Sequence, residues 1–181
     1  IRAFGNWTMG CMDSIACNFN PDANMADGSC NYPKLGYDCD DNLVEFIVGM
    51  EAEGGIIFYV DSSGGGLVAF VEDLGKYEWG CHGDNLDGAY NSGIGYGLEN
   101  TFAIDSLCDD SLIAASVSLA FESNGYEDWY LPSISELELL YNTLGNSEGE
   151  IANLTDSIYW SSSQANSDDG WVVNFATGNT E

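Results

Sequence analysis

The most reactive group of side chains lies in the stretch CHGDNLDG, residues 81–88, which contains the only histidine, His82. Histidine titrates near neutral pH and can serve as a general base. No serine lies in a nucleophile-elbow sequence, however, and no cysteine is expected to be free, so we predict that the chain is not an enzyme. The neighbouring oxygens of Asp84, Asn85 and Asp87 either bind calcium in this loop or belong to a solvated turn.

Ligand binding is another use for this stretch. Tryptophan rings can stack on sugar rings, but tryptophans in motifs such as Trp-x-Leu-Pro and Tyr-Trp-Ser more often belong to a core. Both alternatives stay open for Trp79, Trp129, Trp160 and Trp171. The candidate ligand-binding residues are Trp79, His82, Asn85, Tyr90, Asp168, Asp169 and Trp171.

Oxygen-bearing side chains also gather in GCMDSIACNFNPDANMADGSCNY, residues 10–32. Calcium binds about six to eight oxygens from such a set. The match to an EF-hand loop is poor, because Ala26 stands where an acid is needed and no glutamate closes the site. The alternative is that these side chains cap turns through hydrogen bonds to nearby backbone groups. The candidate calcium ligands are Asp13, Asn18, Asn20, Asp22, Asn24 and Asp27 here, and Asp84 and Asp87 in the later loop.

The charge of the chain limits its partners. There are 30 aspartates and glutamates against 3 lysines and arginines, a formal net charge of −27, which argues against nucleic acid and anionic lipid as main partners. It favours divalent cations, salt-rich water, or neutral and basic surfaces. Thirteen per cent aromatic residues indicate a folded chain rather than an acidic tail. No apolar run approaches the roughly 18 residues that a membrane-spanning helix needs, so we expect no membrane insertion.

Six cysteines indicate an oxidising compartment. No Cys-x-x-Cys pair occurs, and His82 has no partner at zinc-ligand spacing. Disulfides are therefore expected, in a secreted, extracellular or cell-surface protein whose targeting sequence lies outside this chain. Residues 10–32 have too few apolar side chains for a core of their own, so this segment needs such cross-links.

Two strands are expected before the central loop at residues 81–101. GGIIFYV and LVAFV are buried, β-prone runs joined by a glycine-rich turn. The loop is rich in glycine and has no apolar period, and loops of this length are usually functional or anchored. Cys81 and Cys108 can link its two ends.

Two helices and two further strands are expected after the loop. The first helix begins near Asp110–Ser111, runs through LIAASVSLAF and stops at Gly125. The second begins with the capping box Ser133-x-x-Glu136, followed by an apolar stripe at residues 137, 140, 141 and 144. The strands IYWSSS and GWVVNFA come last, joined by the polar loop QANSDD.

Residues 10–32 resemble a repeat common in secreted and surface proteins of marine Bacteroidota-type bacteria. Four cysteines, at positions 11, 17, 30 and 39, allow three pairings by themselves. Family versions that lack the middle cysteine keep the outer two, so the resemblance implies Cys11–Cys30 and leaves Cys17 for Cys39. The matching positions are Gly10-Cys11, Asp13, Ala16-Cys17-Asn18, Asn20-Pro21, Ala23 and Asp27-Gly28-Ser29-Cys30.

Residues 54–178 resemble the Lcl C-terminal domain family, named for a collagen-like bacterial adhesin. The resemblance lies in GGIIFYVD, GLVAFVED, EWGC, NGYEDWYLPSISELELLY, YWSSS and GWVVNF. The Trp-x-Leu-Pro-Ser turn is also similar to the sulfatase-modifying-factor branch of C-type-lectin-like folds. Together these imply an α+β, C-type-lectin-like domain with two helices and a small antiparallel sheet, preceded by a small, disulfide-linked, mostly irregular module. The sulfated ligand of the founding adhesin is not carried over, because this chain lacks the positive charge to bind it.

The chain begins with IRAF, and family members usually end with a strand of the type Val-Arg-x-Ile/Val-Arg-x-Phe that does not follow GNTE here. We interpret 1–9 as the last strand of a preceding domain copy plus a linker, 10–42 as the disulfide-rich module, 43–53 as a linker or first strand, and 54–181 as a lectin-like domain lacking its closing strand. In this hypothesis Ile1–Phe4 of one copy lies beside strand 171–175 of the preceding copy, head to tail. The alternative is a chance match, since four residues are few.

These observations support two functional hypotheses. The first is a tandem repeat unit of a large secreted bacterial surface or filament protein, with a structural and adhesive role. The second is a lectin whose 81–101 loop and 161–171 region bind a neutral glycan or a target cell surface, with calcium as cofactor. An enzyme is the weakest hypothesis. Asp-Ser-aliphatic triplets also resemble the O-glycosylation signal of Bacteroidota secreted proteins, which makes Ser14, Ser106, Ser111 and Ser157 candidate sites.

Overall fold

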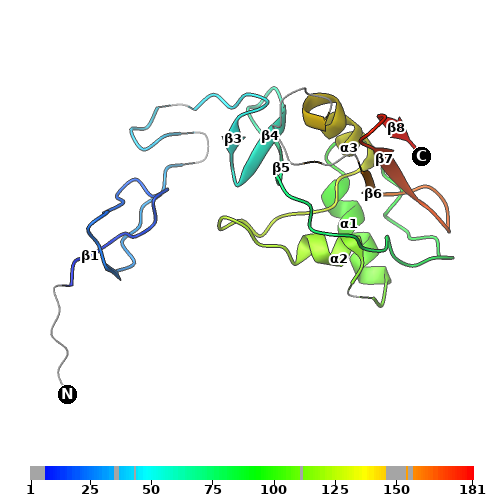
Figure 1. The fold of residues 1–181 in the computed structure, drawn as a ribbon, viewed down its shortest axis with the longest axis horizontal. Coiled ribbons are helices and arrows are strands. Elements are labelled where there is room, and N and C mark those ends of the chain that lie inside the picture. The colour runs from blue at the N-terminus through cyan, green and yellow to red at the C-terminus, as the bar shows by residue number, and fades with distance from the viewer. Residues whose placement is uncertain (1–6, 35–36, 43, 111, 146–153, 155–156) are drawn as a thin grey trace, which may run out of the picture. The chain divides into compact units, whose positions relative to one another are not determined.

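The computed structural model describes residues 7–34, 37–42, 44–110, 112–145, 154 and 157–181. The chain divides into two compact units, Ile1–Phe46 and Ile47–Glu181, which are described separately below. Figure 1 traces their elements. The expected strand at residues 1–4 and the candidate glycosylation site Ser111 lie outside the described residues.

The first unit has little regular structure and little buried apolar surface. Its only strands among the described residues, β1 (Met9–Gly10) and β2 (Met25–Ala26), form a short parallel pair. The buried apolar side chains in its described part are Cys11 and Ala16. Two disulfides, Cys11–Cys30 and Cys17–Cys39, cross-link the unit. These are the pairs expected from the resemblance, and they compensate for the small core.

The second unit contains a first antiparallel sheet in the order β3-β4-β5. β3 (Glu51–Ala52), β4 (Gly55–Val60) and β5 (Gly66–Ala69) follow one another along the chain. The β4–β5 turn is held by Asp61, whose Oδ1 accepts hydrogen bonds from the backbone N–H groups of Ser63 and Gly65. The two strands expected around a glycine-rich turn are therefore present.

A second antiparallel sheet has the order β6-β7-β8. β6 (Ile158–Gln164) and β7 (Gly170–Asn174) are the strands expected at the end of the chain, and β8 (Asn179–Thr180) is an addition. The backbone turns back at Gly178, whose φ of +76° favours glycine, and Glu181 then exchanges two hydrogen bonds with Val172.

The position of β8 corrects one expectation. β7 pairs with β6 on one side and with β8 on the other. The edge of strand 171–175 that was expected to receive a strand from a neighbouring copy is therefore already paired with the chain's own residues 179–181.

The described part of the second unit has three α-helices where two were expected. α1 (Gly97–Leu107) begins inside the presumed irregular loop, α2 (Ala114–Leu119) is shorter than the expected 110–125 helix, and α3 (Ile134–Leu140) continues into the π-helical turn η1 (Tyr141–Gly145). α2 ends early because Phe121 leaves the helix and packs against Phe70 and Trp129. Among the described residues, no helix combines the length and the apolar character that crossing a bilayer requires.

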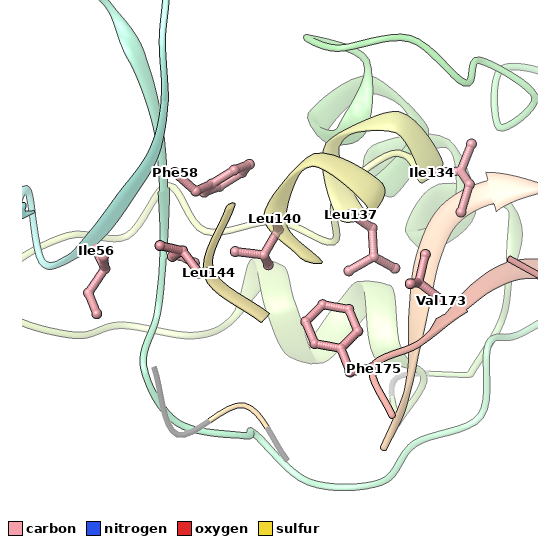
Figure 2. Packing of buried hydrophobic residues seen from close by; sticks show 9 residues of the cluster. Ile56, Phe58, Ile134, Leu137, Leu140, Leu144, Val173 and Phe175 are labelled. Carbon is pink, nitrogen blue, oxygen red and sulfur yellow. The ribbon is translucent and has the colours of Figure 1, made fainter. Parts of the chain in front are cut away.

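Two apolar clusters form the interior of the second unit. One surrounds α3 and η1, where Leu137, Leu140 and Leu144 pack with Phe58 and Phe175, as Figure 2 shows. Burial of these side chains contributes about 1.5–3 kcal/mol each. The second cluster lies under α1 and the preceding loop, and consists of Trp79, Leu86, Ala89, Ile104, Cys108, Ile113 and Ala115. The third disulfide, Cys81–Cys108, borders this cluster and joins residues 27 positions apart.

The difference between the two units predicts different responses to loss of a disulfide. Each bridge contributes about 2–4 kcal/mol, which is most of the stability that a unit with so small a core can have. The double substitution Cys11→Ala/Cys30→Ala should therefore unfold residues 7–42, with loss of their dispersed NMR signals. The matched change Cys81→Ala/Cys108→Ala should lower the melting temperature of the second unit but leave it folded. Persistence of the first unit's signals without Cys11–Cys30 would contradict this account.

Candidate functional site

Buried polar side chains of β6 hold the central loop in place. Ser161, Ser162, Ser163 and Gln164 are consecutive and at most 3% exposed. Gln164 binds the loop at three points: its backbone N–H donates to Ala89 O at 2.7 Å, its Nε2 donates to Asp84 O at 2.7 Å, and its Oε1 accepts from Leu86 N at 2.8 Å. One glutamine thus fixes the path of residues 84–89.

Ser163 and Asn100 fix the next part of the loop. Both side chains donate to the backbone carbonyl of Asn91, at 2.7 Å from Ser163 Oγ and 2.6 Å from Asn100 Nδ2. Ser163 Oγ also accepts from Ile134 N at 3.0 Å, which connects the loop to the start of α3. Asn100 is fully buried, and its Oδ1 has no hydrogen-bond partner among the described residues.

The carboxylate of Glu136 lies between the beginnings of two helices. It is fully buried, and its Oε2 accepts from Ser133 N at 2.8 Å while Ser133 Oγ accepts from Glu136 N. This confirms the predicted capping box of α3. Its Oε1 accepts from Gly95 N at 2.7 Å, two residues before α1. A carboxylate is favoured here because helix N-termini carry partial positive charge.

Two neighbours of Glu136 show how closely the structure fits this carboxylate. A Cβ atom on Gly97 would lie 2.3 Å from Glu136 Oε2, so only glycine fits at the start of α1. Burial, and secondarily the nearby Glu136 charge, raise the pKa of the Tyr130 hydroxyl well above its ordinary value. We call Asn100, Ser133, Glu136, Ser163 and Gln164 the polar network.

Two of the candidate ligand-binding residues, His82 and Asp168, lie in two loops that meet. Gly83 N donates to Ser167 O at 2.8 Å, which joins the segment after Cys81 to the β6–β7 loop. His82 Nδ1 lies 4.0 Å from Asp168 Oδ1, with both side chains mostly exposed. The structure thus brings together two residues that are 86 positions apart.

The other candidates of this set are more dispersed. Asn85 Oδ1 accepts from the Tyr90 hydroxyl at 2.8 Å. Asp169 Oδ2 accepts from Asn166 Nδ2 within the β6–β7 loop, and Trp171 is 39% exposed on β7. Asp84 and Asp87 are exposed, and the backbone carbonyl of Asp84 is used by the polar network.

Trp79 is a correction to the expected set. Its side chain is 7% exposed, belongs to the cluster under α1 and donates its indole N–H to Ser161 O at 2.7 Å. A ring enclosed in this way has no exposed face on which a sugar could stack. Trp160 similarly donates to Tyr77 O at 3.0 Å, so these two indoles help to hold residues 77–79 against β6.

Most of the candidate calcium ligands of the first unit accept hydrogen bonds from the unit's own backbone. One side-chain oxygen of each residue except Asp22 accepts from a backbone N–H in the described structure; the acceptors are Asp13, Asn18, Asn20, Asn24 and Asp27. Hydrogen bonds from the Ser29 side chain and backbone lower the pKa of Asp27. Within the described ranges, no group of three or more His, Cys, Asp or Glu side chains is arranged to hold a metal ion. Calcium binding stays a prediction.

The remaining sequence candidates are the serines of the Asp-Ser-aliphatic triplets. Ser14 and Ser106 are exposed and Ser157 is half-buried, and Ser106 Oγ donates to Ala103 O.

A surface pocket in the first unit lies beside the Cys17–Cys39 bridge and is bordered by Tyr32 and Lys34. Nearby, hydrogen bonds from Asn42 lower the pKa of Asp38.

Comparisons with protein-family models, with curated proteins and with solved structures give no match for this chain. The resemblances to the Lcl C-terminal domain and to the cysteine-rich repeat therefore stay hypotheses that rest on the quoted motifs.

Sequence reasoning missed the polar network. The sequence places Ser163 and Gln164 in or beside a strand, Asn100 in a loop, and Ser133 and Glu136 in a helix cap. Only Ser133 and Glu136 are predicted to bond to each other. The available signal was the run SSSQ in a strand next to a tryptophan. Successive side chains of a strand point to opposite faces, so four consecutive polar residues place some of them on the face that packs on the interior, and buried polar groups are almost always hydrogen-bonded.

Removal of the Glu136 carboxylate should be costly. The substitution Glu136→Ala leaves the buried N–H of Ser133 without an acceptor and removes the part-buried hydrogen bond from the Gly95 N–H, so we expect a loss of about 2–4 kcal/mol in the free energy of unfolding. The matched control is Glu138→Ala, on the same helix, because Glu138 accepts from the Thr180 hydroxyl near the surface and should cost less than about 1 kcal/mol. Urea denaturation measures both. Equal losses in the two variants would show that the Glu136 carboxylate has no special role.

Proposed function

We propose that the chain is a repeat unit of a large secreted bacterial surface or filament protein, with a structural and adhesive role. The observation that carries this proposal is the use of the buried polar groups. Gln164, Ser163 and Glu136 all bind backbone atoms of the central loop or of the helix starts. Such an arrangement favours a rigid module that keeps its shape over one whose polar groups are available to a substrate.

The first unit supports the same proposal. Its shape depends on two disulfides and on short turns closed by side-chain oxygens. A cross-linked unit of this kind suits a joint between larger modules outside the cell, where disulfides persist. In the proposal, copies follow one another head to tail along one chain, a heterologous arrangement that produces open fibres.

A lectin is the second candidate function, and one observation favours it. The segment around His82 and the β6–β7 loop are joined by the Gly83–Ser167 hydrogen bond, and they expose His82 and Asp168. Trp171, which follows this loop on β7, is 39% exposed. An exposed indole beside polar side chains is a combination that neutral sugars bind. In this alternative calcium would be the cofactor.

A glycan array read with and without a calcium chelator separates the two functions. For a structural repeat unit we expect no selective, calcium-dependent signal, and we expect the encoding reading frame to contain further copies of both units. Selective binding that is lost in Trp171→Ala, but kept in the control Trp7→Ala on the first unit, would favour the lectin. Trp7 is a suitable control because it is 59% exposed. A reading frame with a single copy would contradict the repeat proposal.

We also propose that calcium stabilises the chain, since the net charge of −27 includes carboxylates clustered in residues 13–27 and 38–41. Binding to the folded form alone would add about 2.7 kcal/mol at a hundredfold excess over Kd. The melting temperature should rise between chelator and millimolar calcium at constant ionic strength. Asp22→Asn should reduce this rise, and Asp61→Asn, in the other unit, should leave it unchanged. A melting temperature insensitive to calcium would disprove the proposal.

A further inference from the structure

The solvent-facing side of α1 is unusually apolar. Leu98 and Phe102 are one helical turn apart, so they are neighbours on the same face, and they are 39% and 55% exposed. The face that α1 buries contains Gly97, Asn100, Thr101 and Ile104, of which only Ile104 is a large apolar residue. A surface helix normally has the opposite arrangement, with its apolar side toward the core.

The apolar surface continues into the residues just before the helix. Ile94 and Tyr96 are each 44% exposed. Their backbone is held in place, because Gly93 O accepts from Ser133 Oγ at 2.8 Å and Gly95 N donates to Glu136 Oε1 at 2.7 Å. A rigid surface loses little conformational entropy when it binds a partner.

Carboxylates flank this surface. At 3.6 residues per turn, Glu99 and Asp105 lie about 60° to either side of Phe102 around the helix axis. Both are exposed. From residue 77 to residue 181 the sequence contains no lysine or arginine, so no such side chain from this stretch neutralises the two carboxylates. We call Ile94, Tyr96, Leu98, Glu99, Phe102 and Asp105 the α1 face.

We propose that the α1 face binds a cationic, amphipathic protein segment, whose apolar side chains pack on Leu98 and Phe102 and whose lysines or arginines lie against Glu99 and Asp105. The net charge of the chain favours this kind of partner over anionic lipid, nucleic acid or a second copy. Anionic lipid and nucleic acid are repelled by a chain of charge −27, and a second copy carries the same charge. A basic segment is attracted by it, and charge complementarity of this kind also speeds association. This proposal goes beyond the structural role above and does not depend on it.

Binding of a defined probe tests the apolar half of the proposal. The probe is a labelled synthetic peptide of leucine and lysine that forms an amphipathic helix, mixed with the whole oxidised chain and followed by fluorescence anisotropy. Leu98→Ser/Phe102→Ser should weaken binding about tenfold or more. The matched control Val48→Ser/Ile158→Ser removes two exposed apolar side chains elsewhere and should leave binding unchanged. Equal affinities for all three chains would overturn the proposal.

The charged half has its own control. Glu99→Lys and Glu127→Lys change the net charge equally, and both glutamates are exposed. Only Glu99→Lys should weaken binding and reduce its salt dependence. If Glu99→Lys and Glu127→Lys weakened binding equally, the attraction of the peptide would be non-specific. Equal binding of a scrambled peptide with the same composition would lead to the same conclusion. Two further results would overturn the proposal by assigning the face to another occupant. One is self-association of the chain that is lost in Leu98→Ser/Phe102→Ser, and the other is binding of this face to phospholipid vesicles.

Discussion

A buried carboxylate between two helix N-termini is the contact on which the second unit depends. Glu136 accepts hydrogen bonds from Ser133 N and Gly95 N, and it therefore connects the start of α3 with the approach to α1. Without this acceptor, the buried Ser133 N–H would be unsatisfied and the part-buried Gly95 N–H would lose its hydrogen bond, which would destabilise both helix starts. The carboxylate also explains two neighbouring features, the glycine required at position 97 and the raised pKa of Tyr130. The end of the loop before α1 and the start of α3 are thus joined by one side chain.

The two units reach a stable fold by different physical means. The second unit buries two apolar clusters and satisfies the polar groups between them with a hydrogen-bonded network. The first unit buries few apolar side chains in its described part, so covalent cross-links and short side-chain-to-backbone turns take their place. This contrast follows from composition. Residues 10–32 are rich in Asp, Asn and Gly, which favour turns, whereas β4 and α3 are rich in Ile, Leu and Phe.

The elements that the sequence predicts are those with a local signal. Ser133 and Glu136 form the expected capping box, and the strands around Ile57 and Val172 have the expected β-prone, apolar sequences. α1 has no such signal, because Asn100 and Thr101 occupy its buried face. β8 is only two residues long, and one of them, Asn179, is of a type that is depleted in strands, so it gives no clear signal by itself. α1 is set by distant contacts, such as the bond from Gly95 N to Glu136, whereas β8 is a short local pairing with the strand just before it.

The same distinction applies to the candidate site. The sequence identifies His82 and Asp168 as separate polar candidates, but their proximity depends on the Gly83–Ser167 hydrogen bond between distant loops. The burial of Trp79 likewise depends on a carbonyl of β6 that lies 82 residues away. Residue type predicts what chemistry a side chain can do, whereas burial and proximity depend on the tertiary structure.

The polar network has a consequence for how this domain can diverge in evolution. Its bonds to the central loop end on main-chain atoms, such as Asp84 O, Leu86 N and Asn91 O. Main-chain atoms are present whatever the side chain, so the path of the loop does not require particular residues at its exposed positions. Substitutions there can accumulate while the backbone keeps its course. Homologues that retain the network are therefore free to present different surfaces on one unchanged scaffold.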